Sequence, residues 1–476
     1  MSKSKTIWLI VIGFAILYGI FAGVSGHMRM DKLARDLRYG SPTAKIAAAT
    51  ELMKRDRLYD KTQEMKPAER IKAMDALDKI PGDLTVKQSL ILLKDTEATV
   101  RARATKVLIA VGKNHVDLLV PAMKDSDENV RNGAKDALVG IGPKVIPAVK
   151  KAAKVADTRP AAFDVLARLG EPSVPAVVEL LGVGDQDVRM GAATSLGKIR
   201  STQGTPALLK ATRDIRAVRE LAISSLCDIC DPRSTDLLVE VLSQTKDNGE
   251  VRARAARALS VIGGPTAIVA LTDALGDFDL KVRSSVIGGF QRVGAPAISA
   301  IAAKLTSGSK VVREAAAQSL ERTNSPEAAS ILMRLAKDAD PTVRASAARG
   351  LGVQSAGVQP ENLVSLLSDG ADQVGEAAVS SLASMGSRAV PCLASVLKSS
   401  ASEVSKYRAA EALSKIGSDA VPSLMALLGG DIQTSKWAAY ALGRTGDPRA
   451  KPALEKLAKA ADKDLATVAQ RALRRL

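Results

Sequence analysis

Residues 338–352 read Asp338-Ala-Asp-Pro-Thr-Val-Arg-Ala-Ser-Ala-Ala-Arg-Gly-Leu-Gly352, and most of the chain repeats this pattern. We set the valine of the Val-Arg pair, Val343, as position zero of a repeat frame. Successive frames are 25 to 33 residues apart, mostly 30 or 31. The fifteen frames begin at residues 44, 69, 100, 130, 158, 188, 218, 251, 282, 312, 343, 374, 405, 434 and 465.

Each frame carries the same small and large apolar residues. The residue four positions after the frame is alanine in fourteen of fifteen copies, and the residue eight positions after it is leucine in fourteen. The two exceptions, Val286 and Phe290, belong to one copy. Offsets 0, +4 and +8 lie on one stripe of an α-helix, where a small alanine lets a neighbouring helix approach closely. The pattern predicts fifteen amphipathic helices.

Helix boundaries are also visible in the sequence. Ten copies have a capping side chain three positions before the frame, and glycine follows many of the helices. A second apolar run, such as residues 174–181 or 421–428, separates successive copies. Each unit is therefore predicted to be a helical hairpin, and hairpins must stack into a solenoid because neither helix can bury its apolar face alone. The expected caps are Ser41, Asp127, Asp185, Asn248, Asp279, Ser309, Asp340, Ser402, Asp431 and Asp462, and the expected terminal glycines are Gly112, Gly142, Gly170, Gly263, Gly294, Gly386 and Gly417.

Composition agrees with a repeat array rather than with large globular domains. Aromatic residues make up 3% of the 476 residues, and four of the twelve precede residue 25. The interior is therefore expected to be thin and aliphatic. The net charge of +17 is spread along the chain instead of forming one dense stripe. This charge favours anionic partners in general, including weak contact with anionic lipid, but it does not lead us to expect nucleic acid.

The N-terminal part has the pattern of a membrane anchor. Residues 7–24 are eighteen uncharged, mostly aliphatic positions, just long enough to cross a bilayer as a helix. We therefore expect a short basic tail over residues 1–6, a transmembrane signal-anchor helix over 7–26, a basic juxtamembrane segment over 27–38 and the repeat solenoid over 39–476. Cleavage of the apolar segment as a signal peptide stays an alternative.

Orientation and pairing of this anchor are less determined. Lys3 and Lys5 precede the segment, while several basic residues follow it, so the charge rule does not choose one side. Long C-terminal domains are translocated with little regard to charge, so we favour an extracytoplasmic, periplasmic body and leave a cytoplasmic one open. Ala15, Gly19 and Gly23 recur every four residues, which would allow a homodimer through close helix packing. The alternative is that glycine is simply tolerated there.

The repeat consensus resembles a known family. The pattern Asp-x-Val-Arg-x-x-Ala-x-x-Ala-Leu-x-x-Ile-Gly, seen with small departures at Asp127 to Gly142, is similar to the HEAT-like repeat of the phycobilisome-lyase type. The resemblance covers about residues 39 to 476. It implies an all-α solenoid of about fifteen helical hairpins. It leaves function open, because the family includes scaffolds, adaptors, bilin lyases and DNA-alkylation repair proteins.

A basic residue follows the frame position in twelve of the fifteen copies, and it could form a row of anion contacts. In proteins with similar repeats this arginine pairs with an aspartate between helices, which implies a structural ladder here with Asp95, Asp125, Asp277 and Asp338 as partners. We favour the ladder, since a partly buried charge needs a partner. Gly375, Ser435 and Ala466 break the pattern, so the ladder is expected to weaken there. The arginine ladder proposed from the sequence comprises Arg101, Arg131, Arg189, Arg219, Arg252, Arg283, Arg313 and Arg344.

The sequence offers little for catalysis or metal binding. It has two histidines, His27 and His115, so triads and histidine-bound metal sites lack parts. Cys227 and Cys230 have a spacing used for zinc or for disulfide exchange, but other ligands are far away and the pair ends a helix instead of beginning one. We expect both thiols to be packing residues, with a local disulfide left open. The sequence predicts no enzyme and no cofactor.

The most specific surface feature lies near the C-terminus. Tyr407, Arg408, Trp437 and Tyr440 fall on the polar face of two consecutive repeated helices, the face that lines the concave side of similar solenoids. Aromatic residues with arginine are typical of binding hot spots. We expect a partner-binding patch here, and the alternative is that the rings pack between repeats.

These features favour a membrane-tethered scaffold or adaptor that presents a solenoid surface to a protein partner or membrane complex. One alternative, implied by the resemblance, is a lyase or assembly factor for a cofactor-bearing protein. A second is a basic surface that binds anionic lipid or nucleic acid.

Overall fold

The computed structural model describes residues 29–244, 248–305, 308–354 and 357–476. The described chain is helical throughout, with short 3₁₀ turns and without β-strand in these ranges. It divides into two compact units, and the second unit is Cys230–Leu476. The expected transmembrane segment, including Ala15, Gly19 and Gly23, lies outside the described residues. Within them, no single helix is long and apolar enough to cross a bilayer, although one pair, Leu280–Val293 with Ala295–Lys304, reaches the required length and composition with a bend of 118° between its helices.

The described part of unit 1 begins with a helical stretch over residues 29–39. Helices that belong alternately to two layers follow this stretch. In the first layer each even-numbered helix from α4 to α14 packs on the next, as α6 does on α8 and α12 on α14, while the odd-numbered helices cover them. The even helices are α2 (Pro42–Lys54), α4 (Pro67–Met74), α6 (Ala98–Val111), α8 (Glu128–Ile141), α10 (Arg159–Leu169), α12 (Gln186–Ile199) and α14 (Arg216–Ile229). The odd helices are α3 (Leu58–Gln63), α5 (Asp83–Leu92), α7 (Val116–Ala122), α9 (Ile146–Ala152), α11 (Val174–Leu181) and α13 (Thr205–Ala211).

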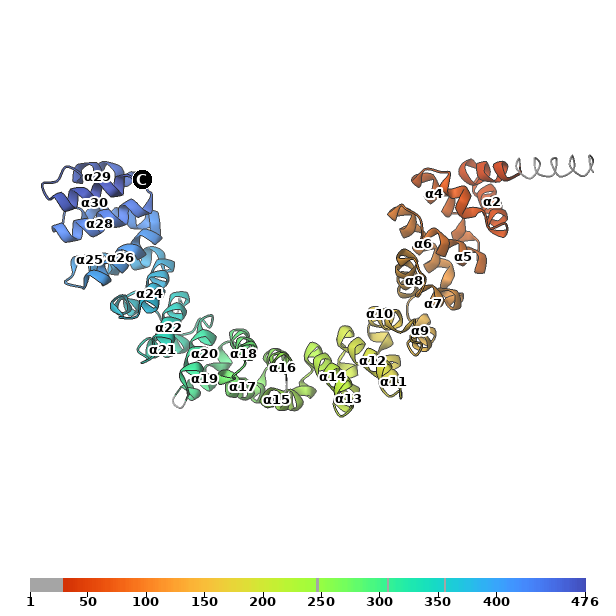
Figure 1. The fold of residues 1–476 in the computed structure, drawn as a ribbon, viewed down its shortest axis with the longest axis horizontal. Helices are drawn as coiled ribbons and strands as arrows, with labels where there is room; N and C mark the ends of the chain where they lie inside the picture. Colours follow the sequence, from red (N-terminus) through yellow and green to blue (C-terminus); the bar gives the residue numbers. More distant parts are fainter. Residues whose placement is uncertain (1–28, 245–247, 306–307, 355–356) are drawn as a thin grey trace, which may run out of the picture. The chain divides into compact units, whose positions relative to one another are not determined.

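Unit 2 has the same two-layer arrangement, and Figure 1 shows α16 to α22 along one edge of it with α15 to α21 along the other. Its even helices are α16 (Gly249–Ile262), α18 (Leu280–Val293), α20 (Lys310–Leu320), α22 (Pro341–Val353), α24 (Asp372–Ser384), α26 (Glu403–Ile416), α28 (Ile432–Thr445) and α30 (Lys463–Leu473). Its odd helices are α15 (Thr235–Ser243), α17 (Gly264–Asp273), α19 (Ile298–Lys304), α21 (Pro326–Leu335), α23 (Glu361–Val364), α25 (Val390–Lys398), α27 (Val421–Leu427) and α29 (Lys451–Leu457).

Every sequence frame falls on an even-numbered helix, except that Thr158 caps α10. The residues at offset +4, from Ala48 to Ala469, are all buried. The leucines at offset +8 are buried too, apart from Leu473 in the last helix, which is partly exposed. The predicted apolar stripe is therefore confirmed, and it forms the contact between successive even helices.

The predicted helix ends are confirmed with two differences. Nine of the ten expected caps accept a hydrogen bond from the first turn, and Ser309 stands at the cap position of α20 without one. Six of the seven expected glycines have positive φ angles, between 61° and 86°. Gly112 has a φ of −76°, so it is not a left-handed cap, and our expectation for it was wrong.

Candidate partner-binding surface

Arginines directly after the frame position donate hydrogen bonds to the loop that precedes their own even helix. In Arg344, the guanidinium Nη1 donates to the carbonyl oxygens of Asp338, at 2.8 Å, and Ala339, at 2.9 Å. These acceptors lie six and five residues earlier in the chain. The same bond to the residue six positions earlier is made by Arg101, Arg131, Arg189 and Arg283. The arginine thus supplies a donor to carbonyl groups in the turn that starts the helix.

Five of these arginines reach a carboxylate 25 residues later, in the next repeat. Arg344, for example, binds Asp369 through two parallel hydrogen bonds, Nε to Oδ2 at 2.7 Å and Nη2 to Oδ1 at 2.9 Å. In every case the aspartate stands 25 residues after the arginine, in the loop that precedes the next even helix. Each such pair therefore links two consecutive repeats. The pairs are Arg70 with Asp95, Arg189 with Asp214, Arg252 with Asp277, Arg313 with Asp338, and Arg344 with Asp369.

Other members of the proposed ladder have no aspartate at this spacing. The residues 25 positions after Arg101, Arg131 and Arg283 are serine, alanine and glycine, and these arginines donate to backbone carbonyls. Asp125, which we expected to pair with a ladder arginine, instead lies 3.8 Å from the Nζ atom of Lys94. Arg219 occupies the equivalent position on α14, with glutamine 25 residues later. The side-chain ladder is thus interrupted.

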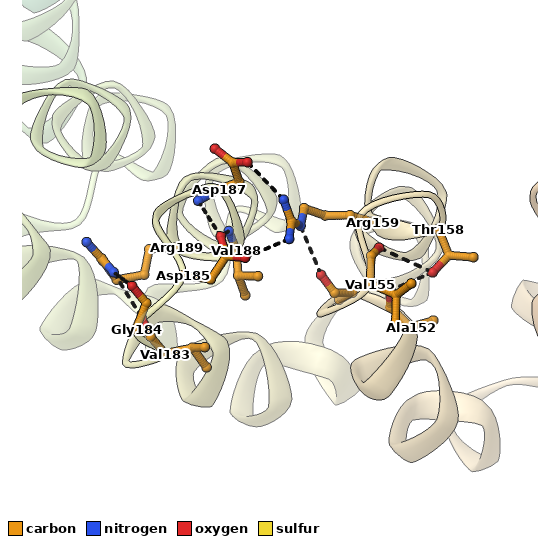
Figure 2. Close-up of polar contacts among 11 residues, drawn as sticks. Ala152, Val155, Thr158, Arg159, Val183, Gly184, Asp185, Asp187, Val188 and Arg189 are labelled. Carbon is orange, nitrogen blue, oxygen red and sulfur yellow. Dashed lines mark hydrogen bonds and ion pairs between the residues drawn. The ribbon is translucent and has the colours of Figure 1, made fainter.

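Arg159 shows how one interruption is compensated. Gly184 stands 25 residues later, so Arg159 binds the carboxylates of Asp185, at 2.8 Å, and Asp187, at 3.0 Å (Figure 2). Asp185 is at the same time the cap of α12, where it accepts the backbone N–H of Asp187 at 2.8 Å. Arg159 therefore links its repeat to the next one through the cap of the following helix.

The paired aspartates are stabilised as carboxylates. Hydrogen bonding to Arg313 lowers the pKa of Asp338, and hydrogen bonding to Arg344 lowers the pKa of Asp369. Arg189 lowers the pKa of Asp214 in the same way. Each of these side chains is largely buried, where an ion pair with fixed hydrogen bonds holds both charges.

Arg408 does not join the aromatic residues with which we expected it to form a patch. It is buried, and its Nη1 donates to the carbonyl oxygens of Leu367, at 3.0 Å, and Asp369, at 2.9 Å. Asp369 stands six residues before Gly375, so Arg408 makes the bond that an arginine at position 375 would make. Its Nη2 also binds Asp372 at 2.8 Å. The sequence-based expectation was therefore wrong for Arg408. Its guanidinium donates hydrogen bonds to the loop of the adjacent repeat and is not available to a partner.

The three rings of the expected patch do come together, on α26 and α28. The ring centroids of Tyr407 and Trp437 are 6.1 Å apart, those of Tyr407 and Tyr440 5.9 Å, and those of Trp437 and Tyr440 5.8 Å. Tyr407 is 41% exposed, and the other two rings are half-buried. At these distances aromatic rings contact one another directly. The aromatic trio (Tyr407, Trp437 and Tyr440) is therefore a closed cluster that offers its outer edges, with no space between the rings for a ligand.

Polar groups surround the aromatic trio. The indole Nε1 of Trp437 donates to Oε2 of Glu403 at 3.2 Å, and hydrogen bonding to Tyr440 raises the pKa of Tyr407. The guanidinium of Arg444 lies 5.7 Å from the ring centroid of Tyr440 and 3.8 Å from Glu411. Arg444 was not among the residues we expected here, although it lies one helical turn after Tyr440. A half-buried apolar centre with a charged rim is the composition of many protein interfaces.

The remaining candidate residues that the structure describes are His115, Cys227 and Cys230. His115 lies 2.6 Å from Asp83 through Nδ1, in the turn before α7, and His27 lies outside the described residues. Cys227 is buried near the end of α14, and Cys230 follows that helix with a φ of 55°. Among the residues that the structure describes, no group of three or more His, Cys, Asp or Glu side chains could hold a metal ion.

Two layers of antiparallel helices repeated along the chain, with linking side chains at a fixed spacing, define an α-solenoid. The family model described as HEAT repeats matches residues 156–217, 214–291, 298–357, 360–434 and 393–474. These matches cover more than half of the chain, so the protein belongs to the HEAT repeat family.

Several solved structures are similar to the chain at low identity. A crystal structure of Kap121p is 13% identical with a TM-score of 0.49, over 91% of this chain and 57% of Kap121p. Kap121p bound to Ste12p gives 13% identity and a TM-score of 0.48, over 94% and 56%. Human deoxyhypusine hydroxylase in complex with glycerol gives 20% identity and a TM-score of 0.24, over 51% and 96%. The chain thus spans little more than half the length of Kap121p, and at these TM-scores the similarity says nothing about function. Comparison with curated proteins gives no match.

Proposed function

We propose that this HEAT repeat protein is a non-enzymatic scaffold or adaptor that binds a protein partner or complex through the layer of even-numbered helices. The observation that carries the proposal is the aromatic trio, which places Tyr407, Trp437 and Tyr440 together on two adjacent even helices with a charged rim. Clustered aromatic residues with neighbouring arginine supply much of the binding energy of protein interfaces. Ladder arginines that donate to carbonyls and aspartates, such as Arg344, stabilise the helix array and are not part of this binding surface.

We further propose that residues 7–26 tether the solenoid of residues 39–476 to a membrane as a single-pass anchor, preceded by the tail of residues 1–6 and followed by the segment of residues 27–38. The support is the uncharged stretch in the sequence. We place the body on the extracytoplasmic, periplasmic side, with homodimerisation through Ala15, Gly19 and Gly23 as a secondary proposal. Weak contact of the basic body with anionic lipid is a further one.

The phycobilisome-lyase type of repeat remains a proposal from the consensus at residues 127–142. The corresponding alternative function, a lyase or assembly factor for a cofactor-bearing protein, would need a site for chemistry on the cofactor. The favoured scaffold function needs only an exposed, preformed surface, which the aromatic trio supplies.

Crosslinking in native membranes, followed by mass spectrometry, tests this function. The double variant Trp437→Ala/Tyr440→Ala is expected to lose a partner that the wild-type chain captures, with unchanged helix content by circular dichroism. A matched control on the opposite layer is Lys398→Ala at the end of α25, which is exposed and should capture the partner normally. Equal capture by the aromatic variant and by the wild type would contradict the proposal.

A further inference from the structure

Unit 2 carries a second exposed feature, a row of arginines on its even helices. Arg292 lies in the last turn of α18, Arg322 follows the C-cap of α20, and Arg349 lies on α22, so consecutive repeats contribute one each. All three are exposed. We call these three residues the arginine row. They were not singled out by the repeat pattern, because they occupy its variable polar offsets.

The arginine row differs from the ladder in its partners. Arg292 donates to the hydroxyl of Ser260, and Arg349 donates through Nη2 to the hydroxyl of Ser346 at 2.8 Å. Within the described ranges, none of the three arginines lies within ion-pair distance of a carboxylate, whereas Arg313 and Arg344 in the same repeats are bound to aspartates. The row therefore presents positive charge that the chain itself does not neutralise.

The surface around the arginine row has a defined pattern. Val261, Arg292, Arg322 and Val353 all stand ten positions after their repeat frames, on four consecutive even helices or their ends. Both valines are 57% exposed. Gly288, on α18, has open space above it, since a Cβ added there would meet no atom within 4 Å. The face thus carries positive charge in the middle and an exposed valine at each end. At Gly288 no side chain covers the backbone of α18.

We propose that the arginine row binds an extended acidic segment of a protein partner, with apolar side chains of that segment on Val261 and Val353. Packed helices lie about 8–10 Å apart, which is about three residues of extended chain. Arg292 and Arg322 have the same offset on successive helices and would therefore meet carboxylates about three residues apart. Arg349 lies one helical turn before Val353 and would meet a carboxylate adjoining the second. Guanidinium groups bind carboxylates through paired hydrogen bonds. The inference rests on the proposed scaffold function and names the chemistry of one bound segment.

Two features favour an acidic peptide over a polyanion such as nucleic acid. Phosphate backbones make no use of exposed valines, and no aromatic side chain stands in the row to stack on bases. One carboxylate also stands on the even helices, at the other end of α16 from Val261: Glu250, in the first turn, is 3.7 Å from Arg257 and 3.5 Å from Lys281. Such a carboxylate repels a uniformly charged backbone, but a peptide can place a neutral or basic residue beside it.

A purely structural role for these arginines must be separated from binding, because cations near helix C-termini interact favourably with the helix dipole. The variant Arg292→Gln/Arg322→Gln/Arg349→Gln keeps long polar side chains and removes three charges. Its control, Arg334→Gln/Lys337→Gln/Lys398→Gln, removes three exposed charges on and beside the odd helices α21 and α25 of the same unit. Both variants have the same net charge, so any difference in binding reports the position of the charges.

The test uses the purified full-length chain in mild detergent and a fluorescein-labelled, serine-based peptide of ten residues, with leucine at positions 1 and 10 and glutamate at positions 4, 7 and 8. Fluorescence anisotropy at low salt is expected to show binding that is at least about tenfold weaker for the arginine-row variant and changed less than about twofold for the control. Replacing the glutamates of the peptide by glutamine should abolish binding.

Three binding outcomes would overturn the proposal. The arginine-row variant could bind the peptide as the wild type does, the two variants could lose binding equally, or single-stranded DNA or phosphatidylserine vesicles could bind more tightly than the peptide and depend on the same three arginines. If the arginine-row variant retains peptide binding while the Trp437/Tyr440 variant loses its partner in membranes, this inference fails and the scaffold function stands. Loss of helix content by the arginine-row variant alone would show that the three arginines serve the fold, which also contradicts the inference.

Discussion

The guanidinium of Arg408 occupies the space that Gly375 leaves empty in the adjacent repeat. A Cβ placed on Gly375 would lie 2.2 Å from Cζ of Arg408, well inside contact distance. Arg408 comes from α26 and Gly375 from α24, and Arg408 donates to the carbonyl of Asp369 as an arginine at 375 would. The absence of one ladder arginine is therefore compensated by an arginine from the following helix.

This relationship predicts a rescue. Arg408→Ala should destabilise unit 2 by about 2–3 kcal/mol, because it leaves the buried carbonyl groups of Leu367 and Asp369 without their donor. Gly375→Arg added to Arg408→Ala should recover most of that loss. Urea unfolding followed by Trp437 fluorescence measures this in a Trp8→Phe background, where Trp437 is the only tryptophan. Additive losses in the double variant would contradict the compensation.

A second prediction concerns pH. The carboxylates of Asp338 and Asp369 have lowered pKa values in the folded state because Arg313 and Arg344 donate to them. An aspartate in an unfolded chain has a pKa of about 3.9. The stability that these pairs contribute is therefore complete above that value and is lost as the pH falls through the lower folded pKa. The free energy of unfolding of unit 2 should stay level from neutral pH to about pH 5 and fall below about pH 4.

Asp369→Asn serves as the matched variant for this pH profile. It should cost roughly 1–3 kcal/mol at neutral pH, since Arg344 keeps its position but loses a charged acceptor. Its stability should then decline less steeply than that of the wild type below about pH 4, because one titrating group has been removed. The comparison is made by urea titration at each pH, and parallel profiles for the two proteins would contradict a contribution from Asp369.

The aromatic trio gives a third prediction, which separates binding from packing. Trp437→Ala should lower the free energy of unfolding by about 1.5–3 kcal/mol, because partial burial of the ring adds to aromatic contacts that contribute about 0.5–1.5 kcal/mol beyond burial. Thermal unfolding followed by circular dichroism measures this loss. A cost of about 4 kcal/mol or more would show that the rings serve mainly to hold α26 against α28.

A fourth prediction concerns Cys392 on α25. Burial raises the pKa of its thiol to about 11, so very little thiolate is present near neutral pH. Iodoacetamide at pH 8 should therefore alkylate Cys392 much more slowly in the folded chain than in urea, as measured by peptide mass spectrometry. Rapid alkylation of the folded chain would mean that α25 opens or that the thiol is more exposed than in the structure.

The fold could be predicted from the sequence because the same apolar stripe recurs in fifteen helices. Ala347 and Leu351 are buried for the same reason as their counterparts in every other repeat, and the caps follow from local backbone chemistry. Asp369 could have been identified as a ladder residue from its spacing of 25 from Arg344. Arg408 could not, because its role depends on a side chain missing from another helix. The aromatic trio was predictable from offsets on two helices, but not the direct contact of its rings.

Site-specific photocrosslinking in native membranes shows whether the even helices carry a partner-binding surface. A benzophenone amino acid replaces Tyr407 in the aromatic trio or, in separate chains, Lys398 on the odd-helix layer. We expect a discrete crosslinked protein from position 407 that position 398 does not give. No adduct at 407, or the same adducts from both positions, would contradict a partner-binding surface on the even helices.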